Sequence, residues 1–396
     1  MIKTMIKEEL KKFFRSSLKW VLLIVFLLNL AIIYIDYIEF KNQVGNVKEY
    51  NKFADSYEGK LDIQFANQCR KNSLQGNYAD QDGDIKESTI ENGHGKLAYF
   101  YSDYWMCSEY YKAWLNVNGE TDNNPISYNA LKKYVSDSGN KDDPLYPVKK
   151  LEYDMLGKVG APNYYYNIVG IKKIMVSITG GMISFFSIML VLIVIAASVF
   201  SIENSSNMNS IILTSKNGRT RIMRAKMLVA QIISLFWISV YYWVSILLNL
   251  LLYDNYEKLS LPLNAVGSFY MSPYSLNIGQ YLIIGYLFYF VGAFAIMGIF
   301  SVITVAVKNI VLSLGISLLI FLVPLFLPTN GMFGTIGILF PNISMQANQL
   351  FQNMQAIIVA GKSVLICYIA PIISLIIGII MNILLPHVYL KVSISK

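Results

Sequence analysis

The sequence has few charged residues for its length. Only 15% of its 396 residues are Asp, Glu, Lys or Arg, whereas about a quarter of the residues in a typical soluble domain are charged. Apolar residues make up 55%, and the mean hydropathy is +0.44. This balance excludes an ordinary soluble globular protein and predicts an integral membrane protein.

Histidine and cysteine are also scarce. The two histidines, His94 and His387, lie far apart and leave little material for a zinc site, so we expect no metal centre. Cys367 lies in an apolar run, where a buried thiol acts as a small hydrophobe. Cys69 and Cys107 lie in a polar segment that we place outside the cell, where a disulfide is chemically allowed. Their spacing leaves open whether they are bonded.

The chain lacks recognisable catalytic and nucleotide-binding motifs. Gly361-Lys362-Ser363 is similar to the end of a phosphate-binding loop, but Ala356 occupies the position of the first glycine. No G-x-S-x-G or H-E-x-x-H motif occurs. We therefore expect no enzyme activity, and any active transport must draw its energy from a partner or an ion gradient. The scarcity of charges in the apolar runs disfavours an ion-driven pump.

Long apolar runs define the predicted architecture. A run of about 20 apolar residues suffices for a helix that crosses a bilayer. We expect an all-α polytopic membrane protein with six transmembrane helices and an inserted soluble domain that is α+β or mainly helical. The predicted segments are 1–19 (amphipathic interfacial helix), 20–38 (first crossing), 39–173 (extracellular domain), 174–202 (second), 203–226 (cytoplasmic loop), 227–253 (third), 254–277 (outer loop), 278–307 (fourth), 310–328 (fifth), 329–362 (re-entrant or outer-leaflet helices), 363–385 (sixth) and 386–396 (cytoplasmic tail).

The distribution of charge predicts the orientation. The chain carries a net charge of +8, yet Glu39–Gly170 holds more acidic than basic residues, so the positive charge belongs to the membrane part. Short loops rich in Lys and Arg lie on the cytoplasmic side. This rule predicts a multi-pass plasma-membrane protein with both termini in the cytoplasm. The basic residues mark orientation and contacts with membrane lipids, and we expect no nucleic-acid partner.

The stretch before the last crossing is unusual. No charged residue occurs from Asn309 to Gly361, although a crossing uses only the first part of this run. Leu350, Met354, Ile357 and Ile358 recur at helical spacing. We expect a re-entrant or interfacial helical hairpin at the outer leaflet, because non-spanning backbone at that depth must be covered by protein or line a cavity.

The polar link between the second and third crossings carries a recognisable order of residues. Glu203 is followed by a helix-like piece, Met208–Leu213, then by Gly218-Arg219, and by Lys226 at the start of the third crossing. This order resembles the cytoplasmic loop of ABC-2 type (type V) exporter permeases, in which the loop forms a coupling helix that docks on a separate ATPase subunit. By this resemblance the coupling residues are Glu203, Met208, Ile211, Ile212, Leu213, Arg219, Arg221 and Lys226.

The resemblance implies a function and partners. It implies a permease that pairs with a second copy or a similar permease and exports an amphipathic cargo, such as an antimicrobial peptide, a drug or a lipid-like molecule. ATP and Mg would bind in the ATPase subunit, with no cofactor in this chain. The alternative hypothesis is a non-transporting membrane receptor or scaffold whose extracellular domain binds a ligand or cell-wall component. Four polar residues are candidates either to line a cargo path or to bind helices together: Gln231, Asn249, Gln280 and Asn382.

Overall fold

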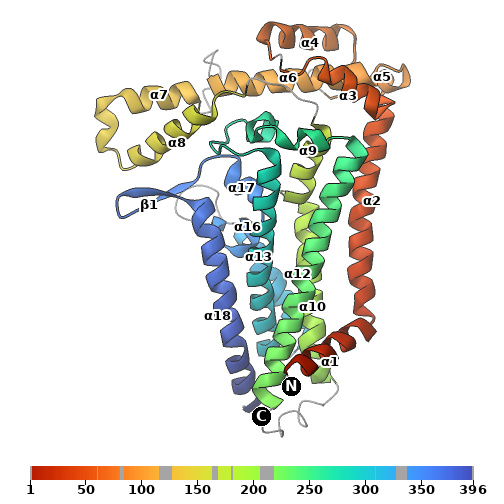
Figure 1. The fold of residues 1–396 in the computed structure, drawn as a ribbon, viewed down its shortest axis with the longest axis vertical. Coiled ribbons are helices and arrows are strands. Elements are labelled where there is room, and N and C mark those ends of the chain that lie inside the picture. Colours follow the sequence, from red (N-terminus) through yellow and green to blue (C-terminus); the bar gives the residue numbers. More distant parts are fainter. Residues whose placement is uncertain are drawn as a thin grey trace.

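The computed structural model is almost entirely helical and has two parts (Figure 1). It describes residues 2–59, 61–80, 84–115, 127–162, 168–179, 182–205, 218–307, 309–326 and 337–394. Long helices run side by side through the lower part, and shorter helices lie across one end of them as an outer layer. The N and C termini both lie at the opposite end. The protein is thus a helical membrane protein in which one end of the bundle is capped.

The first two helices differ in character. Helix α1 (Ile2–Arg15) lies crosswise at the base of the bundle, and its buried Phe13 belongs to the main hydrophobic core (Figure 1). Helix α2 (Leu18–Val44) is apolar along its membrane part and leaves Ile24, Leu28 and Ile35 exposed. At 1.5 Å per residue, its 27 residues span about 40 Å, longer than a hydrocarbon core of about 30 Å. Its last turns therefore enter the outer layer.

The outer layer consists of helices. Its elements are α3 (Val47–Asp55), α4 (Ile63–Gln75), α5 (Glu87–Glu91), α6 (Gly95–Leu115), α7 (Tyr128–Ser136), η1 (Ser138–Asp142) and α8 (Tyr146–Val159). Side-chain caps define where α3, α4 and α7 begin, because Asn46, Asp62 and Ser127 each accept a backbone N–H of the following turn. The aromatic helix α6 contributes to the hydrophobic core of the outer layer, with Phe100 and Tyr104 fully buried. Of the two alternatives left open by the sequence, the described residues adopt the mainly helical one.

Contacts with the tops of the membrane helices hold the outer layer in place. The Lys258 ammonium lies 2.8 Å from Glu58 and 3.1 Å from Asp55. Burial disfavours the charged form of Lys258, but hydrogen bonds to the two carboxylates outweigh this and raise its pKa. Asn51 Nδ2 donates to Tyr253 O at 3.0 Å. The outer layer is thus bonded directly to the end of the third long helix.

The remaining elements complete the bundle. They are α9 (Val169–Ile174), η2 (Met175–Thr179), α10 (Met182–Ser205), α12 (Gly218–Tyr253), η3 (Tyr256–Ser260), η4 (Leu263–Ala265), η5 (Gly267–Phe269), α13 (Ile278–Val307), α14 (Ile310–Leu322), η6 (Val323–Phe326), α16 (Pro341–Ser344), α17 (Ala347–Phe351), β1 (Ala356–Val359), β2 (Lys362–Leu365) and α18 (Ile366–Ile394). Among the described residues, four helices are long and apolar enough to cross a membrane: Lys19–Val44, Arg221–Tyr253, Ile278–Val307 and Ile366–Lys391. Phe185–Phe200 and Val311–Leu322 are shorter apolar helices at the places of the predicted second and fifth crossings.

The expected helical hairpin before the last crossing is wrong in its second half. Helix α17 ends at Phe351, and Ile357 and Ile358 lie in strand β1, which pairs antiparallel with β2. The row Ile357-Ile358-Val359 is β-branched, and such residues favour strands over helices. Ala360 and Gly361 both have positive φ, 50° and 77°, which suits a two-residue hairpin turn. The local turn chemistry thus outweighs the helical spacing.

Close approach of backbones determines how α13 and α18 pack. A Cβ added at Gly378 would lie 2.4 Å from the Phe294 ring and 3.2 Å from Ala295 Cα, so only glycine fits there. A Cβ at Gly298 would lie 3.0 Å from the Met381 side chain. Small residues let membrane helices approach and gain van der Waals contact, which replaces the hydrophobic driving force that is absent in lipid. The two helices therefore form a tightly packed pair.

This packing predicts different effects of the same substitution at two helical glycines. Gly378→Val should lower stability by about 1 to 3 kcal/mol, because the added atoms overlap Phe294. Gly315→Val is the matched control, since a Cβ at Gly315 has no atom within 4 Å. Thermal unfolding of the detergent-purified variants measures both. Equal melting temperatures for the two variants would contradict the close α13–α18 contact.

Candidate functional site

The end of the bundle that carries both termini also holds several of the residues expected to couple to an ATPase (Figure 1). Helix α10 extends to Ser205 and so includes Glu203, while α12 begins at Gly218 and includes Arg219 and Arg221. The basic residues after Gly218 are therefore helical rather than part of a loop, and Arg221 is exposed. The other predicted coupling residues, Met208, Ile211, Ile212 and Leu213, lie outside the described residues.

A buried lysine joins α10 to α12, the two helices on either side of residues 206–217. Lys226 is only 3% exposed, and its Nζ donates to the backbone carbonyl of Val199 on α10 at 2.9 Å. A buried ammonium is stabilised only when its donors are bonded. Lys226 thus anchors α12 to α10 near the start of α12.

Helix α1 lies against the base of α12. A mainly apolar groove of about 380 Å³ separates them, lined by Thr4, Met5, Glu8, Glu9, Ile222 and Ala225. Lys11 and Lys12 pair with Glu8 and Glu9, each at 2.7 Å. The sequence predicted α1 as an amphipathic helix, and the structure places it beside the first turns of α12, where Arg221 and Arg224 are exposed.

The helix at the place of the predicted second crossing departs from regular α-helical geometry, and a polar network surrounds this departure. Residues Met175–Thr179 form a π-helical turn, η2, and α10 begins at Met182. Such turns are rare, and their backbone bonds join residues five apart instead of four. Asn348 of α17 donates to Met175 O at 2.8 Å and accepts from Thr179 Oγ1 at 2.5 Å and from the Tyr281 hydroxyl. All three side chains are buried.

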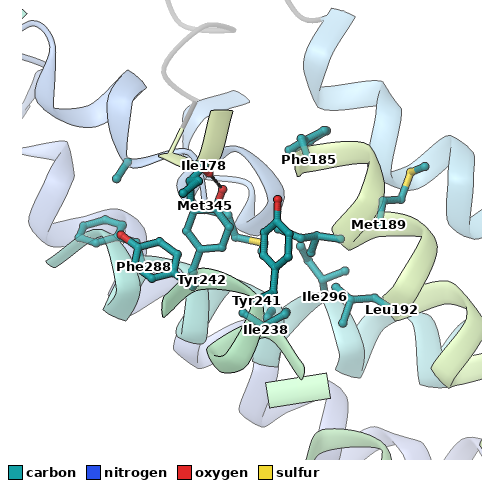
Figure 2. Close-up of a cluster of buried hydrophobic side chains, with 14 of the residues drawn as sticks. Ile178, Phe185, Met189, Leu192, Ile238, Tyr241, Tyr242, Phe288, Ile296 and Met345 are labelled. Atoms are coloured by element: carbon teal, nitrogen blue, oxygen red, sulfur yellow. Dashed lines mark hydrogen bonds between the residues drawn. The ribbon is translucent and has the colours of Figure 1, made fainter. Parts of the chain in front are cut away.

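The Tyr289 hydroxyl satisfies a second carbonyl of the same turn by donating to Ile178 O. Tyr242 donates to Leu282 O at 2.8 Å and lies beside Tyr289, with ring centroids 5.2 Å apart. Figure 2 shows Tyr241, Tyr242 and Met345 packed close to Ile178 within the apolar core. The interrupted helix is thus held by α13 and α17 through hydrogen bonds inside an apolar cluster.

This network was missed by the sequence analysis. Asn348 lies in the segment expected to form the helical hairpin, two residues before Leu350, and Thr179 directly precedes Gly180-Gly181 in the predicted second crossing. A Gly-Gly pair inside an apolar run is a breaker signal. Taken with a polar residue on each side, it could have indicated an interrupted helix. Gly180 and Gly181 themselves lie outside the described residues.

The four candidate path residues do not form one group. Gln231 Nε2 donates to Asn382 Oδ1 at 3.3 Å and to Phe294 O at 3.2 Å, which joins α12 to α18 and α13. Asn249 is buried and donates to Ser245 O of its own helix at 2.9 Å. Gln280 is exposed and caps α13 reciprocally with Asn277. Of the four, only Gln231 and Asn382 meet.

Two lysines at the outer end depart from the expected charge distribution, and each has an acidic partner. Lys172 Nζ lies 2.7 Å from Asp103, and Lys173 Nζ lies 3.5 Å from Asp36. Burial disfavours the charged form of Lys172, but the Asp103 carboxylate outweighs this and raises the lysine pKa. Lys172 therefore fixes α9 to α6 in the outer layer.

The disulfide left open by the sequence is absent from the structure. Cys69 of α4, Cys107 of α6 and Cys367 are free cysteines. Cys69 and Cys107 both pack in the apolar cluster of the outer layer, and burial raises the pKa of each thiol to about 12. Cys69, which is buried, and Cys107, which is partly buried, therefore both act as small hydrophobic residues. Within the described ranges, no group of three or more His, Cys, Asp or Glu residues is arranged to hold a metal ion.

The long apolar helices define a multi-pass membrane protein. A family model described as ABC-2 family transporter protein matches residues 4–359. The chain therefore belongs to this family and is an ABC-2 permease. The match includes the outer layer, whereas the resemblance seen in the sequence covered only the membrane helices and inner loop. Searches of curated proteins and of solved structures gave no match.

The polar network yields a prediction. Asn348→Leu should cost about 1 to 3 kcal/mol, because the buried Tyr281 hydroxyl loses its acceptor and the Met175 carbonyl keeps only the Thr179 hydroxyl as a side-chain donor. Asn249→Leu is the control, since the Asn249 amide bonds only to its own helix. Thermal unfolding of purified protein compares them. A larger loss for the Asn249 variant would show that the network does not hold the interrupted helix.

The two ion pairs of Lys172 and Lys173 predict different effects of the same substitution. Lys172→Met should lower the melting temperature clearly, because the Asp103 carboxylate, only 16% exposed, loses its partner. Lys173→Met should have little effect, since its 3.5 Å pair with Asp36 is about one-third exposed on each side. The melting temperatures of both variants in detergent test the difference. Similar small losses would mean that Lys172 does not fix α9 to the outer layer.

Proposed function

We propose that this permease is the membrane-spanning subunit of an ATP-driven exporter that moves an amphipathic cargo outward. Its membership of the ABC-2 family supports a transport role and implies a partner ABC ATPase. The sequence carries no recognisable nucleotide motif. ATP and Mg would therefore bind to the separate ATPase subunit.

The topology in this proposal has six crossings. The four long apolar helices account for the first, third, fourth and sixth, α10 for the second, and α14 with η6 for the fifth. An even number agrees with termini at the same end of the bundle (Figure 1). The basic residues near that end, among them Arg221 and Lys391, favour a cytoplasmic location.

The observation that carries the coupling proposal is the Lys226 anchor. The ATPase would bind the loop between α10 and α12 together with Glu203, Arg219 and Arg221. Because Lys226 bonds α12 to the Val199 carbonyl of α10, a force on the loop would move both helices together. Rigid-body movement of packed helices is a common way to switch a transporter between two states.

A second permease copy, or a similar permease, would complete the path. Exposed apolar side chains line the outer faces of several crossings, including Phe236 on α12 and Leu287 on α13. Such faces suit lipid or another membrane subunit. The cargo class follows from the family resemblance and the large outer layer: an antimicrobial peptide, a drug or a lipid-like molecule.

Charge reversal tests the docking site. Arg219→Glu with Arg221→Glu should weaken binding of the partner ABC ATPase by more than about tenfold, because acidic groups would face the surface that arginines complement. Co-purification and ATP hydrolysis in proteoliposomes measure this loss.

The charge-matched control is Lys132→Glu with Lys133→Glu, on the exposed face of α7 in the outer layer. This control should leave ATPase binding unchanged. An ATPase that stays bound to the arginine variant, or is lost equally in the control, would refute the docking assignment. ATP hydrolysis by the purified permease alone would refute the division of labour between subunits.

A further inference from the structure

The β-hairpin ahead of the last crossing ends in an exposed apolar tip. We call residues 358–362, the end of this hairpin, the hairpin tip. Ile358 is 42% and Val359 49% exposed, and Ala360 and Gly361 form the turn. Lys362 is exposed and is the first charged residue after the long uncharged stretch. A soluble hairpin normally carries polar residues at such a turn.

The hairpin leaves the bundle sideways at the outer end of α18. Figure 1 shows it directed away from the long helices, across the direction of α18 and beneath α7 and α8. The base of the hairpin is buried, since Leu365 is 8% exposed and Ile357 packs against the main core. The base is thus held rigidly, and the tip is presented to the surroundings.

The level of the tip follows from the length of α18. About 20 residues cross a hydrocarbon core of about 30 Å. Counting that number back from His387, at the predicted inner boundary, reaches the first turn of α18. Strand β2 runs directly into α18 at Ile366, so the hairpin lies at the other boundary of the bilayer.

The exposed residues continue a surface that faces lipid. Tyr368, Ile372 and Ile376 are 65%, 57% and 49% exposed along α18. The apolar tip extends this surface sideways, with a tyrosine and a lysine close to the boundary. Apolar side chains flanked by Tyr and Lys are typical of segments at the membrane interface, where the ammonium meets lipid phosphate.

We infer that the hairpin tip is a lipid anchor: Ile358 and Val359 insert into the interfacial layer of the bilayer beside α18, and Lys362 contacts lipid phosphate. The anchor fixes the depth of the short helices α16 and α17, which precede the hairpin and carry Asn348. This role depends on α18 crossing the bilayer and is independent of cargo, ATPase and direction of transport.

Spin-label accessibility tests the anchor in the full chain. The three cysteines are replaced by alanine, Val359→Cys is labelled with a nitroxide, and the protein is reconstituted in phosphatidylethanolamine–phosphatidylglycerol vesicles. Molecular oxygen concentrates in lipid, whereas a nickel chelate stays in water. Ile376→Cys on α18 is the lipid control and Ser136→Cys, exposed at the end of α7, the aqueous control. Lys362→Cys provides a second position in the tip if the first variant fails to fold.

The expected result is an oxygen-to-nickel accessibility ratio at residue 359 several-fold above that of the Ser136 label and below that of the Ile376 label, which lies deeper in the hydrocarbon core. A ratio equal to the Ser136 value would place the tip in water and overturn the inference. Low accessibility to both reagents, with dipolar broadening between labels, would show that a second copy covers the tip and would equally overturn it. An aqueous signal at Ile376 would remove the premise that α18 crosses the bilayer.

Discussion

The structure depends on one requirement: every backbone polar group within the bilayer must have a hydrogen-bond partner. A regular helix meets it within its own segment. At the π-helical turn Met175–Thr179, side chains from other elements bond the backbone as well, because Asn348 donates to Met175 O and Tyr289 donates to Ile178 O. Because these donors come from α17 and α13, the interruption determines where the segment before the last crossing must lie. The short helices α16 and α17 are therefore part of the bundle's hydrogen-bonding system.

The outer layer obeys a related electrostatic rule. Two lysines at the capped end of the bundle are each placed beside a carboxylate: Lys172 with Asp103 and Lys258 with Asp55 and Glu58. The partner carboxylates lie in the outer layer and the lysines follow or precede membrane helices. Each pair therefore also joins the outer layer to the bundle. Movement of α9 or α12 must carry the outer layer with it, unless these pairs break.

The sequence predicted the elements that hydrophobicity alone determines. The long apolar helices and the amphipathic α1 follow from composition and 3.6-residue spacing. The ABC-2 family was identified from the order of residues around Glu203 and Lys226 and is confirmed by the family match. A helix was wrongly predicted at Ile357–Ile358, because the helical spacing there extends over only a few residues. The turn residues Ala360-Gly361 instead favour a β-hairpin. The Asn348 network could not be predicted, because it joins residues that are 67 to 173 positions apart in the chain.

The contacts between the long helices show how the bundle is bonded together. Helix α12 is bonded to α10 through buried Lys226, and α13 packs closely on α18 at Gly378. Between these two pairs, Gln231 bridges from α12 to Phe294 O and Asn382, while its Oε1 is buried and has no partner among the described residues.

The same two pairs are also joined by tyrosines, because Tyr242 on α12 donates to Leu282 O on α13 and the Tyr289 hydroxyl on α13 donates to Ile178 O. An unsatisfied buried acceptor already carries its desolvation cost, so separating the Gln231 bridge loses less free energy than breaking these tyrosine hydrogen bonds. We therefore expect rearrangement between the two pairs to begin at Gln231 and to be limited by the tyrosine contacts.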